Sequence, residues 1–546
     1  MKVGDIVRVE IDGMTHDGNG VGRTDGMVVF VTGAIEGDTV DVRVTSCKKN
    51  FSNGVVHKMI SPSCDRIEPD CRFFGQTGGC DFRNVNYDAE LRYKTVRVRN
   101  AFRKIAGIRD VEVKACIPCN TRSSYRNKSE FSVCRMQAGS VALGFLGSES
   151  SKFVEADKCR LQPEVGNKAL NAVKEVLSMG IVDVLSDEGV NQKSDVGVHH
   201  VIIRTSYVNK ETMIVLISSS KDFLGFEKLA EILSEKMEEI KSVYYVCSPN
   251  DRWNFYNGAR LLCGKKSIED RIGDVTIKIS PESFFQVNTE QAEVLYQNVA
   301  RLADLGEEDV VLDVYCGAGS ISLYLADKCR KVVGIEVVEK AIEDAKENAL
   351  INDISNVEFI CGRAEDEMAA IVKDGTKSDI VILDPPRMGC DRSVLESVAS
   401  IGPERIVYVS CDPETLARDV KVLIQKGYKL AEVQPVDMFP GTAHVETVVL
   451  LSKLNTKQHI EVELNLDELD LTAAESKATY DEVKAYVLEK HGLKVSSLYI
   501  SQVKRKCGLD VGQNYNLSKK EDAKVPQCPP EKEAAIMDAL KHFQMI

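Results

Sequence analysis

The stretch DVYCGAGS, residues 313–320, decides the fold of this 546-residue chain. It begins at the end of the apolar run Val310–Val314, and its two glycines allow a ligand to approach the backbone closely where a helix begins. Glu336 lies 23 residues after Asp313, at the end of the next apolar run, where a carboxylate can accept hydrogen bonds from both hydroxyls of a ribose. The pattern predicts a nucleotide-cofactor site. A GxGxxG fingerprint is absent, which favours S-adenosylmethionine over NAD because a sulfonium ligand has no pyrophosphate to bind.

The region around this turn alternates regularly between apolar runs and helical stretches. The apolar runs are Val310–Val314, Lys331–Ile335, Val357–Ile360, Asp379–Leu383, Arg405–Val409 and Val445–Leu451. Such β-α alternation is typical of a parallel sheet that carries helices on both faces. We therefore predict a doubly wound, Rossmann-like α/β domain over residues 281–454.

Three further regions flank this domain. Residues 1–60 contain short alternating segments separated by turns rich in Gly, Asp and Asn, which predict a small β-barrel. Residues 61–280 combine a cysteine-rich stretch with strands and helices of mixed order, and are predicted to form a central α+β domain with a helix over Glu227–Lys241. Residues 455–546 are predicted to form an acidic linker and a small helical extension. Its helix-turn-helix pattern favours either RNA binding or a structural, protein-docking role.

The overall composition is that of a soluble globular protein, with 43% apolar and 28% charged residues. No stretch approaches 18 consecutive apolar residues and the N-terminus does not resemble a signal peptide, so we expect no membrane association and a cytoplasmic location. The net charge of −13 argues against a general nucleic-acid binder. Residues 92–135, however, hold 12 basic and 3 acidic side chains, which indicates either a local phosphate-binding face or a solvated surface.

Three more motifs stand at the ends of predicted strands in the α/β domain. Residues 383–387 (LDPPR) end one strand, residues 410–413 (SCDP) follow another, and residues 444–447 (HVET) begin the last. Open sheets bind ligands beyond the carboxyl ends of their strands, so we expect these motifs to converge on one crevice. Cys411, on a loop, is predicted to be an exposed nucleophile rather than a core thiol. Glu446 is predicted to be a base rather than a solvated carboxylate.

One thiol, one carboxylate and one methyl donor are the groups that methylation of carbon-5 of uracil requires. Carbon-5 is too weak a nucleophile to take a methyl group unaided. A thiolate that adds to carbon-6 creates an enolate whose carbon-5 can attack the methyl group. A base must then remove the carbon-5 proton, so that elimination releases the thiol. The sequence offers each of these groups.

In combination, these motifs resemble the RNA uracil-5-methyltransferase family over residues 1–454. Residues 4–40 resemble a TRAM domain, a small OB-like RNA-binding β-barrel, and residues 283–288 (SFFQVN) match the start of the family's methyltransferase domain. The resemblance implies that Gln286, Tyr315, Glu336 and Asp384 hold S-adenosylmethionine, together with the turn glycines Gly317 and Gly319.

The same resemblance implies roles for three side chains that act on the RNA. Cys411 would be the nucleophile and Glu446 the base. Phe284 would lie near the target base, where an aromatic face can stack on a flipped-out uracil. The alternative for Phe284 is an aromatic side chain packed in the core.

Many members of this family carry a four-iron, four-sulfur cluster on three closely spaced cysteines and a distant fourth. Here Cys71, Cys80 and Cys159 stand in matching contexts, but Thr77 occupies the place of the middle cysteine, and Thr is a poor ligand for iron. Cys64 offers a replacement thiolate. Three interpretations therefore stay open: a [4Fe-4S] cluster on Cys64 and the other three cysteines, a labile or three-cysteine cluster, or no metal. Zinc would also suit four thiolates.

The expected function is S-adenosylmethionine-dependent methylation of carbon-5 of a specific uridine in structured RNA, with 23S rRNA favoured over tRNA and a monomeric enzyme. Two alternatives stay open. An RNA amino-group methyltransferase would also suit the Asp-Pro-Pro motif but would have no use for Cys411. A non-catalytic RNA-binding or rRNA-folding factor would keep the fold without turnover.

Overall fold

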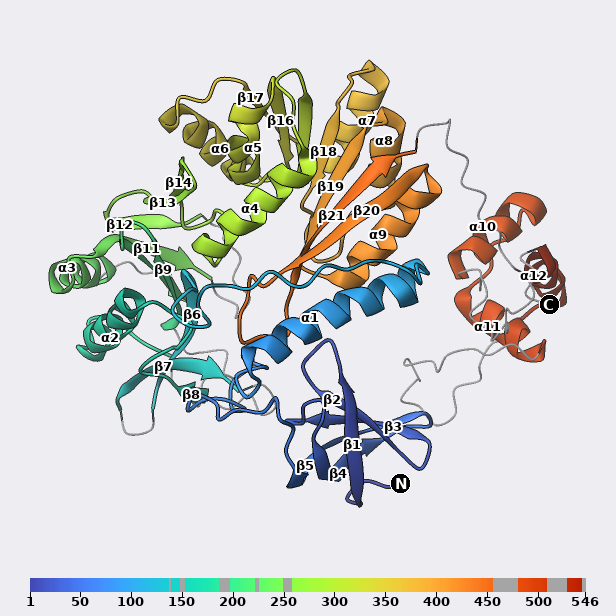
Figure 1. The fold of residues 1–546 in the computed structure, drawn as a ribbon, viewed down its shortest axis with the longest axis horizontal. Helices are drawn as coiled ribbons and strands as arrows, with labels where there is room; N and C mark the ends of the chain where they lie inside the picture. The colour runs from blue at the N-terminus through green and yellow to red at the C-terminus, as the bar shows by residue number, and fades with distance from the viewer. Residues whose placement is uncertain are drawn as a thin grey trace. The chain divides into compact units, whose positions relative to one another are not determined.

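The computed structural model describes residues 1–136, 139–147, 153–185, 197–220, 225–248, 258–454, 480–507 and 528–542. Two compact units divide the chain, residues 1–457 and residues 458–546. Among the described residues, no helix combines the length and apolar character that a membrane crossing needs. The first unit contains a barrel, a long helix and two large sheets (Figure 1).

The N-terminal strands form a closed five-stranded barrel in the order β1-β2-β3-β5-β4. The strands are β1 (Ile6–Met14), β2 (Gly20–Thr24), β3 (Met27–Thr32), β4 (Thr39–Cys47) and β5 (Phe51–Ser61). Alternate residues such as Val9, Val29 and Val40 point inward and are fully buried. At Gly22 the neighbouring strand comes so close that a Cβ atom would lie 2.2 Å from the Glu10 carbonyl oxygen. The predicted barrel is confirmed.

Helix α1 (Tyr87–Ala101) lies between the barrel and the α/β domain (Figure 1). Asn86 caps it, because its side chain accepts a hydrogen bond from the Ala89 N–H. The helix continues as a π-helical turn, Phe102–Ala106, and ends at Gly107, whose φ of 78° favours glycine. The basic stretch that starts at residue 92 therefore begins inside this helix.

The central domain is built on a seven-stranded mixed sheet, of order β12-β11-β10-β9-β6-β7-β8. Its strands are β6 (Lys128–Arg135), β7 (Val141–Leu146), β8 (Phe153–Glu155), β9 (Val198–Thr205), β10 (Thr212–Ser218), β11 (Ile240–Cys247) and β12 (Arg260–Gly264). Helices α2 (Glu164–Ser178) and α3 (Phe226–Lys236) pack against it. The helix predicted over Glu227–Lys241 was too long, because Ile240 already pairs with Thr212 in the sheet.

The catalytic domain has a second seven-stranded sheet, of order β17-β16-β15-β18-β19-β21-β20. Its strands are β15 (Val310–Val314), β16 (Lys331–Glu336), β17 (Val357–Cys361), β18 (Ile380–Leu383), β19 (Arg405–Ser410), β20 (Tyr428–Val436) and β21 (Glu446–Lys453). The first five strands of this order run parallel, whereas β21 is antiparallel to both of its neighbours. The predicted α/β class is confirmed. Sequence analysis missed edge strand β20 and the reversed direction of β21.

Helices cover this sheet and a small hairpin joins it to the central domain. The helices are α4 (Thr289–Ala303), α5 (Ser320–Leu325), α6 (Glu339–Ile351), α7 (Ala364–Asp374), α8 (Arg392–Ile401) and α9 (Pro413–Gln425), and the hairpin strands are β13 (Ile268–Ile272) and β14 (Val275–Ile279). Two continuous hydrophobic cores include residues of the sheet, such as Ile382 in one and Leu383 in the other. Alternate strand residues thus bury both faces of the sheet.

In the second unit, the described residues form three short helices around a core of their own. They are α10 (Tyr480–His491), α11 (Ser497–Lys506) and α12 (Pro530–His542), and their apolar residues, among them Val487, Ile500 and Ile536, are fully buried. The predicted acidic linker lies outside the described residues. RNA binding or a docking role for this unit stays a prediction.

Candidate active site

Strand topology brings the predicted thiol and the predicted base together at one edge of the catalytic sheet. Cys411 directly follows β19, and Glu446 is the first residue of β21. These two strands are antiparallel neighbours, and Ser410 pairs with Thr447. Cys411 and Glu446 are therefore the next residues beyond this pair, at the same end of the sheet. Glu446 also pairs with Val436 of β20.

Glu446 occupies a buried position, with only 4% of its surface exposed. Burial raises the pKa of its carboxyl group to about 8, and the nearby Asp384 carboxylate contributes to the rise. The guanidinium of Arg387 acts in the opposite direction. A carboxyl group that titrates close to neutral pH is suited to accept a proton during turnover.

Cys411 is half-buried beside the same groups. Burial raises the pKa of its thiol to about 11, and the charges of Glu446 and Asp384 add to the effect, whereas Arg387 lowers it. In the protein without ligands, the thiol therefore holds its proton at neutral pH. Formation of the thiolate requires help from positive charge, and Arg387 is the cation positioned to provide it.

Asp384 follows β18 directly, and Asp313 lies within β15. Burial raises the pKa of Asp384 to about 7, with a contribution from the negative charge of Asp313. Burial also raises the pKa of Asp313 to about 6, although the Ser322 hydroxyl donates a 2.5 Å hydrogen bond to its carboxylate. The crevice thus concentrates acidic groups, and a bound cation would stabilise their ionised forms.

The glycine turn and Glu336 form a second part of the crevice. The Gly317 N–H donates to one carboxylate oxygen of Glu336 at 3.2 Å, and the Val338 N–H donates to the other at 2.9 Å. Val337 and Val338 are exposed beside this carboxylate, which provides an apolar surface next to a hydrogen-bond acceptor. This combination fits a nucleoside, whose ribose hydroxyls and flat base need such groups.

Among the other predicted cofactor residues, Tyr315 and Gly319 belong to this turn, and Gln286 lies just before α4. Tyr315 has a φ of 73°, an uncommon conformation for a residue with a side chain, and Gly319 has a φ of 79° where α5 begins. A Cβ atom at Gly319 would lie 2.8 Å from the Phe359 ring, so the turn requires glycine there. Gln286 is buried, and its backbone carbonyl oxygen accepts a 2.8 Å hydrogen bond from the Asn127 side-chain amide of the central domain.

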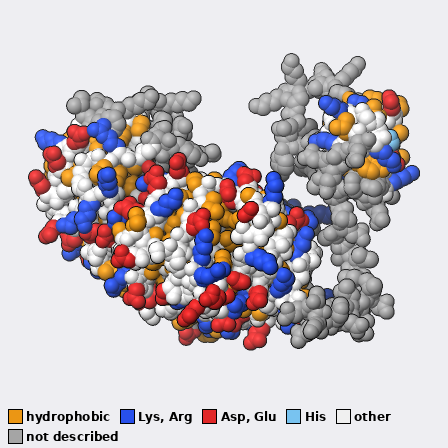
Figure 2. All heavy atoms as spheres, turned by 90° about the horizontal axis from the view of Figure 1, so that it is seen from above, with side chains coloured by type: hydrophobic (Ala, Val, Ile, Leu, Met, Phe, Trp, Pro, Cys, Tyr) orange, Lys and Arg blue, Asp and Glu red, His pale blue; other side chains and the backbone are white. Residues whose placement is uncertain are grey.

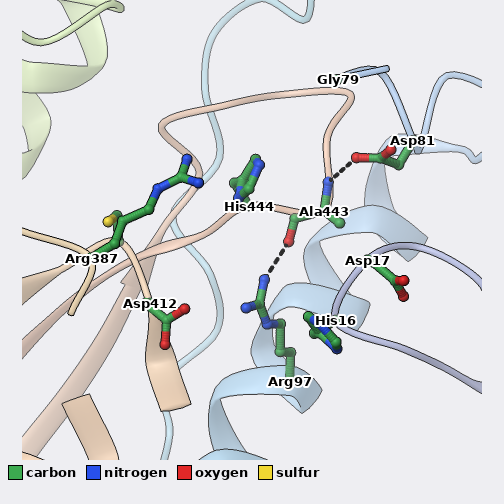
Figure 3. Close-up of a pocket in the computed structure, with 10 residues that line it drawn as sticks. His16, Asp17, Gly79, Asp81, Arg97, Arg387, Asp412, Ala443 and His444 are labelled. Atoms are coloured by element: carbon green, nitrogen blue, oxygen red, sulfur yellow. Dashed lines mark hydrogen bonds between the residues drawn. The ribbon is translucent and has the colours of Figure 1, made fainter. Parts of the chain in front are cut away.

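A cavity of about 320 Å³ opens beside Cys411. It is lined by His16, Asp17, Gly79, Asp81, Arg97, Arg387, Cys411, Asp412, Ala443 and His444. These residues come from the barrel, from the loop between β5 and α1 (the cysteine-rich loop), from helix α1 and from the catalytic domain (Figure 3). A cavity of this size lies at the small end of ligand pockets, which span roughly 300–1,000 Å³.

Sequence analysis missed most of this lining. Arg387 and His444 stood inside quoted motifs, and their positions beside Asp384 and Glu446 were the available signal. Burial lowers the pKa of His444, with contributions from Arg387 and Arg97, so its imidazole is neutral at neutral pH. No sequence signal pointed to His16, because it lies more than 350 residues from the motifs that contain Arg387 and His444 and reaches the cavity only through the fold.

Comparison with known proteins places this crevice in a family. Residues 260–454 match the family model "tRNA (Uracil-5-)-methyltransferase", and residues 1–56 match the TRAM domain. An uncharacterized RNA methyltransferase of Caldanaerobacter subterraneus is 39% identical over 455 residues, which cover 83% of this chain and 99% of the relative. Another, from Clostridium tetani, is 38% identical over 84% of this chain and 98% of its own length.

The chain belongs to the RNA uracil-5-methyltransferase family. It is an S-adenosylmethionine-dependent RNA methyltransferase. Among solved structures, the tRNA (uracil-54, C5)-methyltransferase of Pyrococcus abyssi in complex with S-adenosyl-L-homocysteine has a TM-score of 0.64 and 29% identity, and the match covers 81% of this chain and 99% of that one.

Phe284 of the methyltransferase lies on the surface, with 68% of its area exposed. Its neighbours Ser283 and Phe285 are buried. The buried Arg204 guanidinium holds this segment, because it donates a 2.7 Å hydrogen bond to the Ser283 carbonyl oxygen. The core interpretation of Phe284 was therefore wrong, and its contact with a target base stays a prediction.

The four cysteines predicted as metal ligands of the methyltransferase do not form a complete donor set. Burial raises the pKa of Cys80 to about 11, and the charges of Cys159 and Cys71 contribute, which places these three thiols near one another. Cys64 is exposed, and Thr77 occupies the position of the missing thiolate. Within the part of the chain that the structure describes, no group of three or more His, Cys, Asp or Glu side chains is arranged to hold a metal. A [4Fe-4S] cluster on four thiolates does not fit this arrangement.

Proposed function

We propose that the methyltransferase acts on carbon-5 of a uridine in structured RNA through a covalent adduct between Cys411 and carbon-6 of uracil. One observation carries the proposal: the antiparallel pairing of β19 and β21 sets Cys411, which lines a cavity, next to the buried Glu446. An amino-group methyltransferase would need neither a thiol nor a second carboxylate at this point.

The reaction begins with the Cys411 thiolate, which forms a bond to carbon-6 of the uracil. The C5–C6 double bond opens, and the resulting enolate takes the methyl group at carbon-5. S-adenosylmethionine supplies that methyl group when bound, beside Glu336 and Asp384. The Glu446 carboxylate then removes the carbon-5 proton. The C5–C6 double bond re-forms as the bond between sulfur and carbon-6 breaks, and Cys411 leaves as a thiolate.

Electrostatics of the crevice support these roles. The positive charge of Arg387 favours the ionised forms of both Cys411 and Glu446. The bound cofactor carries a sulfonium cation, and its charge would act in the same direction. Both groups would therefore ionise more readily in the loaded enzyme than in the free protein.

The RNA would approach the cavity across the barrel and the exposed basic residues of α1. The TRAM match and the basic stretch 92–135 support this contact. A uridine of 23S rRNA remains our preferred target from the sequence, whereas the Pyrococcus relative acts on uridine 54 of tRNA. The target base would have to leave its stack to reach Cys411. A monomeric enzyme stays our prediction.

The proposal is tested with labelled S-adenosylmethionine and with total rRNA and total tRNA as separate substrates. We expect label in 5-methyluridine of one RNA class with the wild-type enzyme and none with Cys411→Ala. Label in a base methylated on an exocyclic nitrogen, or retained 5-methyluridine formation by Cys411→Ala, would contradict the proposal. Comparison of 5-methyluridine maps from cells with and without the gene then identifies the uridine.

A further inference from the structure

Arg97 differs from the other arginines of helix α1. Its side chain is only 14% exposed, whereas that of Arg92 is 57% exposed and that of Arg99 is also exposed. Arg97 lines the catalytic cavity, and its guanidinium points toward the backbone at Ala443 (Figure 3). A residue in this place is not free to contact RNA phosphates as its exposed neighbours are.

The guanidinium of Arg97 bonds to both catalytic segments. Its Nη2 and Nε atoms donate to the Glu414 carboxylate at 2.9 and 3.4 Å. Its Nη1 atom donates to the Ala443 carbonyl oxygen at 2.9 Å. Glu414 lies three residues after Cys411, in the first turn of α9, and Ala443 lies three residues before Glu446. One side chain therefore joins the segment of the nucleophile to the segment of the base.

The peptide at residue 443 is also held from its other side. The Ala443 N–H donates to the Asp81 carboxylate at 3.2 Å. The turn of the barrel hairpin packs against this aspartate, since a Cβ atom at Gly18 would lie 2.8 Å from the Asp81 Cβ. Arg97 and Asp81 thus fix both polar atoms of Ala443, directly before His444 and Glu446.

Buried ion pairs from the same helix fix the preceding part of this loop. The Lys94 ammonium lies 2.8 Å from the Glu90 carboxylate and 2.5 Å from that of Asp437. The Gly441 N–H donates to Glu90 at 2.6 Å. All three charged side chains are fully buried, so helix α1 and the loop form one rigid assembly. Arg97 extends this assembly to the active-site cavity.

We propose that Arg97 is a positioning residue, which sets the separation between Cys411 and Glu446 by bridging Glu414 and the Ala443 carbonyl. The planar guanidinium offers several donors in a fixed geometry, and lysine cannot reproduce this bridge. The inference rests on the proposed covalent mechanism, because only that mechanism requires the two side chains to act on the same ring. It assigns Arg97 to the chemistry, whereas the charge pattern of α1 alone would assign it to RNA binding.

Kinetics of Arg97→Ala separate these two assignments. We expect kcat to fall on the order of 10- to 100-fold, because small displacements of catalytic groups have effects of this size. The dissociation constant for RNA should change less than about threefold. Arg99→Ala is the comparison for an RNA contact and should weaken RNA binding. The matched control is Arg392→Ala, which removes a 78%-exposed arginine from α8. It should leave kcat and the affinity for RNA unchanged.

Two further measurements guard against a folding defect. Added guanidinium, at concentrations that leave the wild-type enzyme unaffected, should restore part of kcat in Arg97→Ala, and Arg97→Lys should keep only part of the wild-type rate. Arg97→Ala combined with Glu414→Gln should be little slower than Arg97→Ala alone, since the two residues share one contact. If the decreases in kcat caused by Arg97→Ala and by Glu414→Gln multiplied in the double variant, the two residues would act independently and the proposal would be overturned.

The outcome distinguishes this inference from the proposed function. If the wild-type enzyme forms 5-methyluridine and Arg97→Ala loses RNA affinity with unchanged kcat, the positioning role is wrong and the covalent mechanism stands. If Cys411→Ala retains activity, the mechanism itself is wrong. Loss of kcat in Arg97→Ala, with partial rescue by guanidinium, supports both.

Discussion

The catalytic crevice and the cysteine-rich loop both collect reactive side chains from distant parts of the chain. In the crevice, Asp384, Cys411 and Glu446 stand at strand ends, so the order and direction of the strands determine where they meet. In the loop, Cys71 and Cys80 lie near Cys159, and all three cysteines stand outside strands. Pairing between strands thus fixes the positions of all the side chains at the sheet edge together. In a loop, by contrast, each side chain is positioned by its own contacts.

A second difference concerns charge. Glu446, Asp384 and Asp313 all have raised pKa values, because burial in one crevice penalises their ionised forms. Figure 2 shows acidic and basic side chains mixed over the outer surface, without one dominant sign on the face in view. Three buried carboxyl groups with raised pKa values thus lie together at the crevice, an arrangement that suits the proton transfer proposed for this site.

Replacement of one thiol in each region should give the largest contrast. Cys411→Ala should lower turnover on the order of 10⁴-fold or more, because it removes the nucleophile. Cys80→Ser should leave kcat within about threefold of the wild-type value. Methyl transfer to RNA measures both, and calorimetric titration with S-adenosylmethionine should show unchanged cofactor affinity for Cys411→Ala. Comparable losses of kcat in both variants would remove the distinction between the regions.

Glu446→Gln should lower turnover by about 10²- to 10⁴-fold, the usual contribution of a general base. Addition of Cys411 and methyl transfer can still precede the blocked elimination, so a covalent RNA adduct should accumulate. A slowly migrating band on a denaturing gel reports it, with Cys411→Ala as the control that forms none. Absence of the band in Glu446→Gln would count against Glu446 as the base.

The pH dependence should reflect the raised pKa values of the free enzyme. Glu446, with a pKa of about 8, must be ionised to accept a proton, and Cys411, with a pKa of about 11, must be a thiolate to attack. Both active forms increase with pH, so kcat/KM should rise between pH 7 and 9. Initial rates of methyl transfer at constant ionic strength measure this rise. A flat or falling profile would be inconsistent with these ionisations.

The smallest effect concerns stability. Folding raises the pKa of Glu446 from 4.5 to about 8, so the folded state binds the proton more tightly and its free energy of unfolding decreases as pH rises through this range. Glu446→Gln lacks this ionisation. Its melting temperature should exceed that of the wild type by a few degrees at pH 8 and by less at pH 5. Calorimetry at the two pH values tests this, and an equal difference at both would contradict it.

Sequence reasoning reached the barrel, the doubly wound sheet and the motifs at its edge, because periodicity and turn residues are local signals. It missed β20 and the reversed direction of β21, which depend on pairing between strands rather than on either strand alone. The bridge from Arg97 to Glu414 and Ala443 joins residues more than 300 positions apart. No local pattern distinguishes Arg97 from Arg99, whose side chain is exposed on the same helix.

The most direct test of the account uses RNA in which 5-fluorouridine replaces the target uridine. Fluorine at carbon-5 cannot be removed as a proton, so elimination is blocked in the wild-type enzyme and the adduct should persist. Protease digestion and mass spectrometry of the linked species should place the methylated nucleotide on the peptide that contains Cys411. An intact enzyme that methylates normal RNA but forms no such adduct, or one linked at another residue, would contradict the account.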